Sequence, residues 1–325
     1  MSARVAIIGG GPAGAAAALY LARNGAACTL IEAGARATAG ECVPPEAAPL
    51  LARAGLIDPS TEGHRASAGV RVNWTGEETT HDYLTRPHGR GWNLDRLTFD
   101  EGLRARAEAA GAHVLKARFH GLAGVSPFRL VLSAEGEVLE CAADAVLDAS
   151  GRVSAFARRA GAKRFQHDRL IALHARHTGV VEDPRLLIER TEAGWWYSAG
   201  LRDALVVSFQ TRDNLKAPPP PPPATRRRLQ ELSPASVTRY AAGSSRLDAI
   251  AGEGWLAIGD AAVAHDPLSG HGIAAALRSG FDGAAAMLAW LSGNKRALRM
   301  HAEIRDAAWR AYIDGLAAYY AQPQL

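Results

Sequence analysis

The alternation of apolar and polar positions near the start of the chain predicts a strand, a helix and a second strand in close succession. Residues 4–8 form a short β-branched run that enters a group of glycines, and residues 27–32 form a second apolar run. Between them, residues 13–24 are rich in alanine and leucine, which predicts a helix. Strand, tight turn, helix and strand thus follow one another within about 30 residues.

Apolar patterns predict further elements along the chain. Helices are expected at 96–110, from about 272, and at 301–320, and strands at 113–119, 145–147 and 255–258. The stretch from about 165 to 209 alternates as an antiparallel sheet does, with strands expected at 170–176, 186–189, 195–201 and 205–209. Loops are expected at 40–49, which is rich in proline and small residues, and at 217–223, whose six consecutive prolines cannot pair inside a sheet.

Composition excludes several classes of protein. Apolar residues make up 48% and charged residues 22% of the 325 positions, the balance of a globular chain rather than a disordered or fibrous one. No window holds the roughly 20 uninterrupted apolar residues of a bilayer span, and no basic region followed by a cleavage site indicates export. Three cysteines are too few for a disulfide framework. We therefore expect a cytoplasmic protein without a membrane partner.

The net charge of +4 does not indicate a nucleic-acid partner. Only four residues are lysine, so the basic total is almost all arginine, and alanine is also very common, which suggests a coding bias. The densest basic run, 226–228, follows the proline tract and is interpreted as the solvated face of a loop. No cysteine spacing predicts a metal site. His174 and His177 fall on opposite faces of their expected strand, which favours a structural or surface role for both.

The glycines after the first strand predict a dinucleotide site. In the run Gly9-Gly10-Gly11-Pro12-Ala13-Gly14, Gly9 makes the tight turn, Gly11 lets the backbone approach a pyrophosphate, and Gly14 lets the helix pack closely on the strand. The helix N-terminus, which begins near Pro12 and Ala13, offers the free N–H groups of its first turn after the proline to the phosphates. Glu32 ends the second strand, where a carboxylate can accept hydrogen bonds from ribose hydroxyls.

A second motif predicts that the dinucleotide is FAD. The strand at 255–258 runs into Gly259-Asp260, and a carboxylate at a strand end suits the hydroxyls of a ribityl chain, which flavins have and nicotinamides lack. The segment 265–273 then enters a helix near Gly272, whose N-terminus would point at the ring edge where negative charge accumulates on reduction. The residues of this segment that are expected near the cofactor are Pro267, Gly270, His271, Gly272 and Ile273.

Taken together, these residues resemble the FAD-dependent monooxygenases of the aromatic-hydroxylase superfamily. The segment 92–100 also resembles that group, whose arginine at the position of Arg96 helps to hold the FAD. The segment 148–152 resembles the one that packs beside the pyrophosphate, although Ser150 stands where an aspartate is usual.

A narrower resemblance rests on the segments 40–45, 194–198 and 266–270. They resemble tryptophan-halogenase-like flavoproteins and the flavoprotein maturases of quinone-cofactor amino-acid oxidases and amine dehydrogenases. The resemblance implies that Glu41 and Cys42 lie beside the flavin, with Cys42 as a plain thiol.

Two departures from these relatives bear on the reaction. The halogenases need a lysine shortly after the segment 40–45 to relay hypohalous acid, and no lysine occurs here before Lys116, so halogenation is disfavoured. The maturases usually continue beyond their last helix into an aromatic, arginine-rich tail, whereas this sequence ends at Leu325. Substrate identity is therefore left open.

Pattern and resemblance predict an α/β fold, a Rossmann-like FAD-binding domain with an inserted antiparallel β-sheet substrate domain. The FAD-binding domain is expected to be discontinuous, at 1–70, 92–163 and 245–300, and the substrate domain at 71–91 and 164–244, followed by a C-terminal helix at 301–325. On the strand at 195–201, Trp195 and Tyr197 share one face and Trp196 and Ser198 the other, so one pair could line the substrate cavity.

The resemblance implies a monooxygenase in which reduced FAD reacts with O₂ to give a C4a-hydroperoxide that hydroxylates an electron-rich aromatic, such as an indole or phenol. The aromatic is either a small molecule or a tryptophan of a partner protein, and the electron donor is NAD(P)H or a separate flavin reductase. Two alternatives stay open: a reductase or dehydrogenase of an unsaturated small molecule, and a flavin-binding accessory protein without turnover. No catalytic acid or base is identified.

Overall fold

The computed structural model describes residues 3–34, 41–230, 232–233 and 235–321. One end of the molecule is a six-stranded sheet in the order β20 (Ala251–Gly252), β21 (Trp255–Ala257), β12 (Ala145–Asp148), β1 (Arg4–Ile8), β2 (Ala27–Glu32), β8 (His113–Lys116). Its strands are parallel except for β20, which pairs antiparallel with β21. Strands from the first half and the last quarter of the chain therefore form one sheet.

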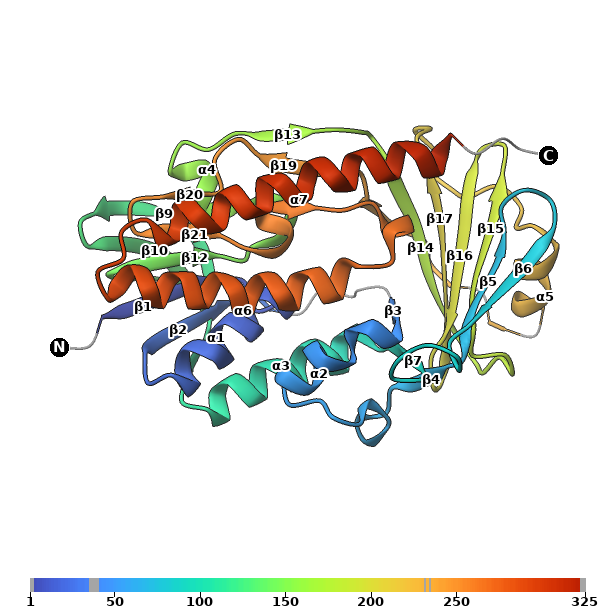
Figure 1. Cartoon of the computed structure of the whole chain (residues 1–325), viewed down its shortest axis with the longest axis horizontal. Coiled ribbons are helices and arrows are strands. Elements are labelled where there is room, and N and C mark those ends of the chain that lie inside the picture. The colour runs from blue at the N-terminus through green and yellow to red at the C-terminus, as the bar shows by residue number, and fades with distance from the viewer. Residues whose placement is uncertain (1–2, 35–40, 231, 234, 322–325) are drawn as a thin grey trace.

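Both faces of this sheet are buried, which explains its unbroken apolar strands. In β1, Val5 and Ile7 join one apolar cluster, whereas Ala6 and Ile8 join another on the opposite face. The first cluster is covered by α1 (Pro12–Arg23), α2 (Ala48–Arg53), α3 (Arg96–Ala109) and α6 (Gly272–Leu291). The second is covered by α4 (Ala155–Arg159) and a sheet of β9 (Arg118–Val125), β10 (Phe128–Ala134) and β11 (Glu137–Ala143) (Figure 1).

The helices α1 and α6, far apart in the sequence, lie side by side in Figure 1. Small residues allow this contact, since a Cβ added at Gly280 would come within 2.3 Å of the Ala13 carbonyl oxygen and within 3.0 Å of the Ala16 Cβ. The contact brings the C-terminal part of the chain against the helix that follows the first glycine motif.

The other end of the molecule is a seven-stranded sheet (Figure 1). Its order is β18 (Thr238–Ala241), β14 (Ile171–Thr178), β17 (Ala204–Thr211), β16 (Gly194–Gly200), β15 (Leu186–Thr191), β5 (Gly69–Asn73), β6 (Glu78–Asp82). All neighbours are antiparallel except β15 and β5, which are parallel. Residues 69–82 therefore complete a sheet that residues 171–241 begin.

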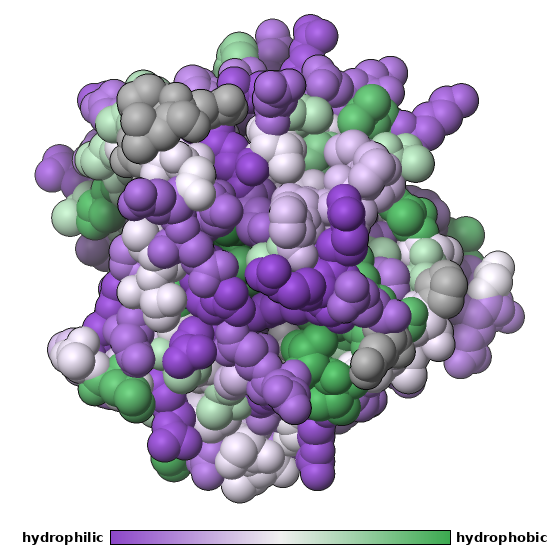
Figure 2. All heavy atoms as spheres, turned by 90° about the vertical axis from the view of Figure 1, so that its right-hand side faces the viewer, coloured by the Kyte–Doolittle hydropathy of each residue, from purple (hydrophilic) through white to green (hydrophobic). Residues whose placement is uncertain are grey.

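The outer face of this sheet is apolar and covered over β14, β16 and β17. Its buried cluster includes Leu173, Trp196 and Phe209, packed against Leu229 of α5 (Pro223–Leu229) and neighbouring leucines. The chain passes from β17 through the proline tract into α5, which lies outside the sheet in Figure 1. Seen from that side, the surface is mostly hydrophilic with scattered hydrophobic residues (Figure 2), as expected once the apolar face is covered.

Short elements connect the two ends. The strands β3 (Glu41–Val43), β7 (Gly91–Leu94) and β4 (Arg65–Ser67) form one small sheet, and β13 (Arg164–Gln166), β19 (Ser245–Leu247) and β22 (Val263–Ala264) form another. Single turns of 3₁₀ helix occur at η1 (Pro45–Ala47), η2 (Pro59–Glu62), η3 (Gly151–Val153), η4 (Gly259–Ala261) and η5 (Pro267–Ser269). The long helix α7 (Ala297–Tyr320) extends from one end of the molecule to the other (Figure 1).

The structure confirms the predicted fold class and corrects three local expectations. The expected loop at 40–49 is wrong, because β3, η1 and the start of α2 occupy its described part, while Gly40 lies outside the described residues. The expected strand at 113–119 divides at Ala117 into β8 and β9.

No helix in the described ranges combines the length and apolarity needed to cross a bilayer.

The third correction concerns the arginines at 226–228, which lie in α5 rather than in a loop. Arg228 turns inward, donates to the carbonyl oxygens of Ser198 and Arg185, and pairs with Asp183 at 3.4 Å. A guanidinium with five N–H donors can satisfy several carbonyl oxygens at once, which the charge run by itself does not reveal.

Candidate functional site

A cavity of about 510 Å³ lies at the carboxyl ends of β1, β2 and β12, the usual position for a ligand of an open parallel sheet. Its walls come from the first glycine motif, from the ends of these strands and from the start of α6. The lining residues are Ile8, Gly9, Gly10, Gly11, Pro12, Ala13, Ile31, Glu32, Ala33, Gly34, Glu41, Arg96, Ala117, Arg118, Phe119, Ala149, Ser150, Gly151, Val153, Ala155, Asp260, Gly272, Ile273 and Ala276.

The three glycines of the motif are required for different reasons. Gly9 has φ +109° and a Cβ there would lie 2.3 Å from the Ala149 carbonyl oxygen. A Cβ at Gly14 would lie 1.8 Å from the Gly9 carbonyl oxygen. Gly11 has ordinary dihedral angles, and a Cβ there would meet no described atom within 4 Å. Gly9 and Gly14 therefore build the turn, while Gly11 leaves open space above the helix.

This cradle fits the phosphates of a dinucleotide. The helix α1 begins with Pro12 and has no side-chain cap, so its first N–H groups are open to the cavity. Beside it, a Cβ at Gly10 would come within 2.1 Å of Glu32 Oε2, so the missing side chain makes room for that carboxylate. Arg104 donates to the Gly10 carbonyl oxygen at 3.1 Å and holds the turn from the other side.

The second sequence motif packs directly on the first. Gly259, with φ +57°, places its Cα against α1, since a Cβ there would lie 2.7 Å from the Cβ of Ala13. Its N–H donates to Ser279 Oγ of α6 at 2.9 Å. Asp260 follows at the junction where this cavity meets a second one, and its Oδ2 lies 3.5 Å from the Nε of Arg152.

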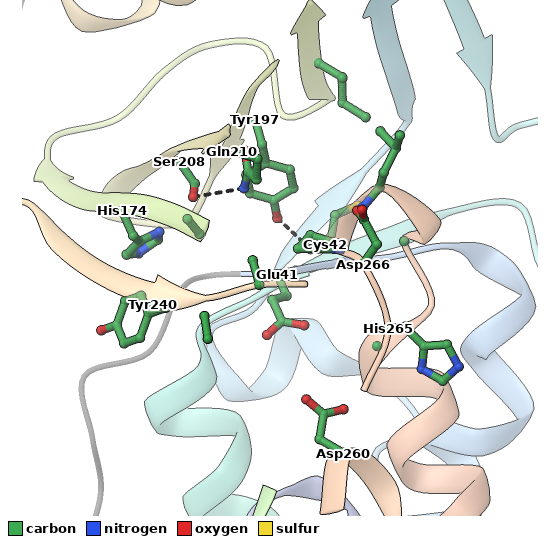
Figure 3. A pocket seen from close by; sticks show the side chains of 18 of the residues that line it. Glu41, Cys42, His174, Tyr197, Ser208, Gln210, Tyr240, Asp260, His265 and Asp266 are labelled. Carbon is green, nitrogen blue, oxygen red and sulfur yellow. Dashed lines mark hydrogen bonds between the residues drawn. The ribbon is translucent and has the colours of Figure 1, made fainter. Parts of the chain in front are cut away.

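A second cavity, of about 320 Å³, lies between this junction and the seven-stranded sheet (Figure 3). It meets the first cavity at four residues that line both, Glu41, Arg96, Asp260 and Gly272. The remaining lining residues are Cys42, Arg152, Ala172, His174, Leu186, Ile188, Tyr197, Ser208, Gln210, Tyr240, Ala241, Ala242, His265, Asp266, Pro267, Leu268 and Gly270. A volume of this size is typical of a small-molecule site.

A charged cluster stands at the junction. Arg96, at the start of α3, is hydrogen-bonded to Glu41 of β3 and pairs with Asp100 at 3.0 Å. Burial alone would lower the pKa of Arg96, but the two carboxylates outweigh it and raise that pKa. Burial raises the pKa of Glu41 despite its arginine partner. The cluster fixes the side chain of Arg96 at the edge of both cavities.

The loop that carries Pro267 and Gly270 is fastened by α7. Asp266 accepts from the N–H of Leu268 at 2.8 Å and from the hydroxyl of Tyr320 at 2.9 Å, and its own N–H donates to the hydroxyl of Tyr312 at 2.7 Å. Trp195 Nε1 in turn donates to the Tyr320 hydroxyl at 3.1 Å. The last helix therefore holds this loop against the seven-stranded sheet.

On the side of the strand β3, Cys42 lies beside Tyr197. The Cys42 N–H donates to the Tyr197 hydroxyl at 3.2 Å (Figure 3). Burial raises the pKa of the Cys42 thiol to about 12, so this cysteine is a protonated, weakly nucleophilic thiol at neutral pH. Trp195 and Tyr197 share the cavity-facing side of β16, whereas Trp196 packs in the outer cluster.

The structure brings nearly all of the predicted cofactor residues to these two cavities. Those that line one or both are Gly9, Gly11, Pro12, Ala13, Glu32, Glu41, Cys42, Arg96, Asp260, Pro267, Gly270, Gly272 and Ile273. Gly14 lies behind the cavity wall, where it permits the helix to approach the turn. His271 is exposed at the start of α6 and lines neither cavity. Their contacts with a cofactor stay predictions.

Sequence reasoning missed several cavity residues. His174, expected to be structural or at the surface, is 6% exposed and lines the second cavity, and Ser208, Gln210 and Tyr240 join it from neighbouring strands. The signal was present in β17, where the polar Ser208 and Gln210 alternate with Val207 and Phe209. Polar positions in a strand that is buried on both faces are rare unless they have a partner.

Comparisons with known proteins agree with this geometry. The family model described as pyridine nucleotide-disulphide oxidoreductase matches residues 3–83. A putative FAD-dependent oxidoreductase, LodB, from Marinomonas mediterranea is 29% identical over 314 residues, which cover 84% of this chain and 81% of the relative.

Two solved structures have a similar fold. The myxobacterial chondrochloren halogenase CndH, described as an FAD-dependent halogenase, superposes with a TM-score of 0.86 at 21% identity, covering all of this chain and 84% of the halogenase. The second is QhpG, which is described as a peptidyl tryptophan dihydroxylase essential for tryptophylquinone cofactor biogenesis. It superposes with a TM-score of 0.75 at 25% identity, and the alignment covers 93% of this chain and 71% of QhpG.

Relatives and structural neighbours are thus FAD-dependent oxidoreductases, hydroxylases and halogenases. The predicted resemblance to aromatic-hydroxylase-like flavoproteins is confirmed, and with it the prediction of an FAD-dependent oxidoreductase.

Proposed function

We propose that this chain is an FAD-dependent monooxygenase that hydroxylates an electron-rich aromatic ring. The observation that carries the proposal is the pair of cavities that meet at Glu41, Arg96, Asp260 and Gly272. The first cavity suits a dinucleotide, and the second leaves space for a small ring beside it. Similarity to a protein described as a peptidyl tryptophan dihydroxylase supports hydroxylation of this class of ring.

The residues of the chain bind, orient and shield in this proposal. The α1 N-terminus and Glu32 would hold the pyrophosphate and ribose of FAD, and Asp260 and the start of α6 would lie beside its ribityl chain and ring. Bound FAD, once reduced, supplies the activation of O₂. The seven-stranded sheet walls one side of the second cavity and would limit the access of water there, which protects reactive species from hydrolysis.

The substrate is proposed to be an indole or phenol, either as a small molecule or as a tryptophan of a partner protein during maturation of a quinone cofactor. Electrons are proposed to come from NAD(P)H or from a separate flavin reductase, and the protein is proposed to act in the cytoplasm. The charged cluster of Arg96 is partly exposed at Glu41, which leaves the site reachable from outside.

Halogenation is disfavoured because none of the four lysines, at positions 116, 163, 216 and 295, lines the second cavity. The relay of hypohalous acid in the relatives depends on such a lysine. Reduction of an isoprenoid chain is disfavoured as well, since the ring nitrogens of His174, which have no hydrogen-bond partner among the described residues, would stay unpaired against an unsaturated hydrocarbon.

The test uses purified protein loaded with FAD, a chemical or enzymatic reductant, and a panel of indoles and phenols under ¹⁸O₂. We expect a product that carries one labelled oxygen atom, with catalase added to remove free peroxide. Peroxide formation alone, with no oxygenated product from any member of the panel, would count against a monooxygenase. Turnover under strictly anaerobic conditions would instead support the reductase.

A further inference from the structure

Two neighbouring strands of the seven-stranded sheet, β14 and β17, present polar side chains to the second cavity while their opposite face packs in the outer apolar cluster. On β17, Ser208 and Gln210 face the cavity, and Val207 and Phe209 pack in the outer cluster. On β14, His174 faces the cavity beside Ala172, and Leu173 packs outside. Because His174, Ser208 and Gln210 are each at least 94% buried, solvent does not explain their polarity.

These three side chains form one contiguous group, which we call the polar wall. His174 stands directly opposite Ser208 in the antiparallel pairing of β14 and β17, and Gln210 is two residues further along the same face. Directly opposed side chains in a sheet lie about 5 Å apart at Cβ. Figure 3 shows them on the sheet side of the cavity, across from Asp260, His265 and Asp266.

Two members of the polar wall satisfy each other. In the amide orientation that suits its neighbours, Gln210 donates to the carbonyl oxygens of Ser208 and Trp195, and its oxygen accepts from the Ser208 hydroxyl at 3.0 Å. The Ser208 hydroxyl thus donates its hydrogen bond to Gln210, and its oxygen can still accept one from the cavity side.

His174 is different, because neither ring nitrogen has a hydrogen-bond partner among the described residues. Its ring makes a T-shaped contact with the ring of Tyr240, with ring centroids 6.1 Å apart. Burial, with smaller contributions from Arg176 and His177, lowers the pKa of His174 to about 4. The neutral ring at pH 7 carries one acceptor and one donor nitrogen, and both are left for a ligand.

We propose that the polar wall, with His174 at its centre, recognises the single N–H or O–H donor of an aromatic substrate. This inference rests on the proposed function and names the feature that selects the substrate. The acceptor nitrogen of His174 and the Ser208 hydroxyl oxygen receive the donor of an indole or phenol, while Ala172, Leu186 and Ile188 contact the ring. An N-methylated or O-methylated analogue fits the apolar part but leaves the acceptors unpaired.

The test measures binding rather than turnover. FAD-loaded protein is titrated with indole and with 1-methylindole, and binding is followed by calorimetry and by the perturbation of flavin absorbance. We expect the wild type to prefer indole about 5- to 10-fold, the size of one neutral hydrogen bond. His174→Leu should lose this preference while it retains its affinity for 1-methylindole, and His174→Gln, which restores an acceptor, should recover part of it.

The matched control is His177→Leu on the same strand. His177 faces away from the cavity and its Nδ1 lies 2.9 Å from the Ser233 carbonyl oxygen, so its removal should leave the preference for indole unchanged. Equal affinity of the wild type for the two probes would overturn the proposal. So would an undiminished preference in His174→Leu, or failure of both probes to bind the wild type.

A second arm distinguishes the sources of the ring. A short peptide with an internal tryptophan is compared with free indole, each against its N-methylated form. Tighter binding of the peptide supports a partner protein, and tighter binding of free indole supports a small molecule, provided that N-methylation weakens the favoured probe. Hydroxylation of N-methylated rings at an unchanged rate would preserve the proposed function and overturn this inference. Binding that depends on the N–H or O–H donor, without hydroxylation of any probe, would support this inference and count against the proposed function.

Discussion

The two cavities are built by opposite means. The first cavity is shaped by what side chains lack: Gly9 and Gly11 expose backbone to it, Gly14 lets α1 approach the turn from behind, and the uncapped start of α1 faces it. The second cavity is shaped by side chains that a sheet carries at alternate positions, among them His174 and Ser208. A backbone site recognises a charge common to many cofactors, whereas a side-chain wall can distinguish one ring from another.

The same contrast predicts how each region tolerates substitution. At the backbone site, added atoms meet the main chain of a neighbouring turn, which cannot move without loss of the fold. At the polar wall, a substitution changes the lining of a cavity and does not press on the main chain. Stability should therefore depend on the first region and substrate selectivity on the second.

The largest expected effect is at Gly14. A methyl group there would stand 1.8 Å from the Gly9 carbonyl oxygen, so Gly14→Ala must displace α1 from the turn. We expect the free energy of unfolding to fall by about 3 kcal/mol, the upper part of the range for overpacking. Chemical denaturation of the FAD-free protein measures this directly.

Gly11→Ala is the control for that change, because a Cβ at this position meets nothing within 4 Å and the dihedral angles suit alanine. Stability should change by no more than about 0.5 kcal/mol, while the Kd for FAD rises roughly tenfold as the methyl enters the space for the phosphates. Equal destabilisation by both substitutions would contradict the division of roles among the glycines.

The junction between the cavities is expected to respond less. Arg96→Met leaves the carboxylates of Glu41 and Asp100 without their cation. The free energy of unfolding should fall by about 2 kcal/mol, below the range for a fully buried pair because Glu41 is partly exposed. In a double-mutant cycle, Glu41→Gln should recover part of the loss, and strictly additive effects would show that the two side chains are not coupled.

His174 of the polar wall should make the stability of the protein sensitive to acid. Burial lowers the pKa of His174 from its ordinary 6.5 to about 4, so the unfolded chain takes up this proton at higher pH than the folded one. The associated stability is complete above pH 6.5 and is lost as the pH falls toward 4. Between pH 7 and pH 5, the free energy of unfolding should therefore fall by roughly 1–2 kcal/mol less in His174→Leu than in the wild type, as measured by chemical denaturation at each pH.

His265 and His301, whose pKa burial also lowers to about 4, provide the comparison. Removal of His301, on α7 and outside both cavities, should reduce the acid sensitivity to a similar extent without any change in substrate preference. An acid profile identical to that of the wild type in His174→Leu would show that the ring is solvated or already charged.

The smallest expected effect is a gain in stability at the polar wall. At pH 7.5, His174→Leu replaces a buried ring without hydrogen-bond partners among the described residues by an apolar side chain. We expect the free energy of unfolding to rise by up to about 1 kcal/mol, because the cost of the unpaired nitrogens disappears. Thermal and chemical unfolding of the substrate-free protein measure it, and a loss above 1 kcal/mol would indicate a structural role.

Features that neighbouring residues determine could be predicted from the sequence, and features that distant residues determine could not. The run from Arg4 to Glu32 was assigned to a strand, a turn, a helix and a strand with bounds close to those of β1, α1 and β2, since neighbouring residues determine them. The segments 40–49 and 226–228 were assigned wrongly, because partners distant in sequence decide their structure: β7 pairs with β3, and the carbonyls of Ser198 and Arg185 attract Arg228.

The sequence by itself determined the class of fold and located the glycine turn and the strand-end carboxylate that line the first cavity. Glycine spacing, a helix start and a strand-end carboxylate act within about 30 residues, so their meaning does not depend on the rest of the chain. Only the tertiary structure decided which residues line the second cavity. His174, Ser208 and Tyr240 lie on three strands, and the register of β14 with β17 and β18 brings them together. Register depends on the burial of whole strand faces, a property that no short motif carries.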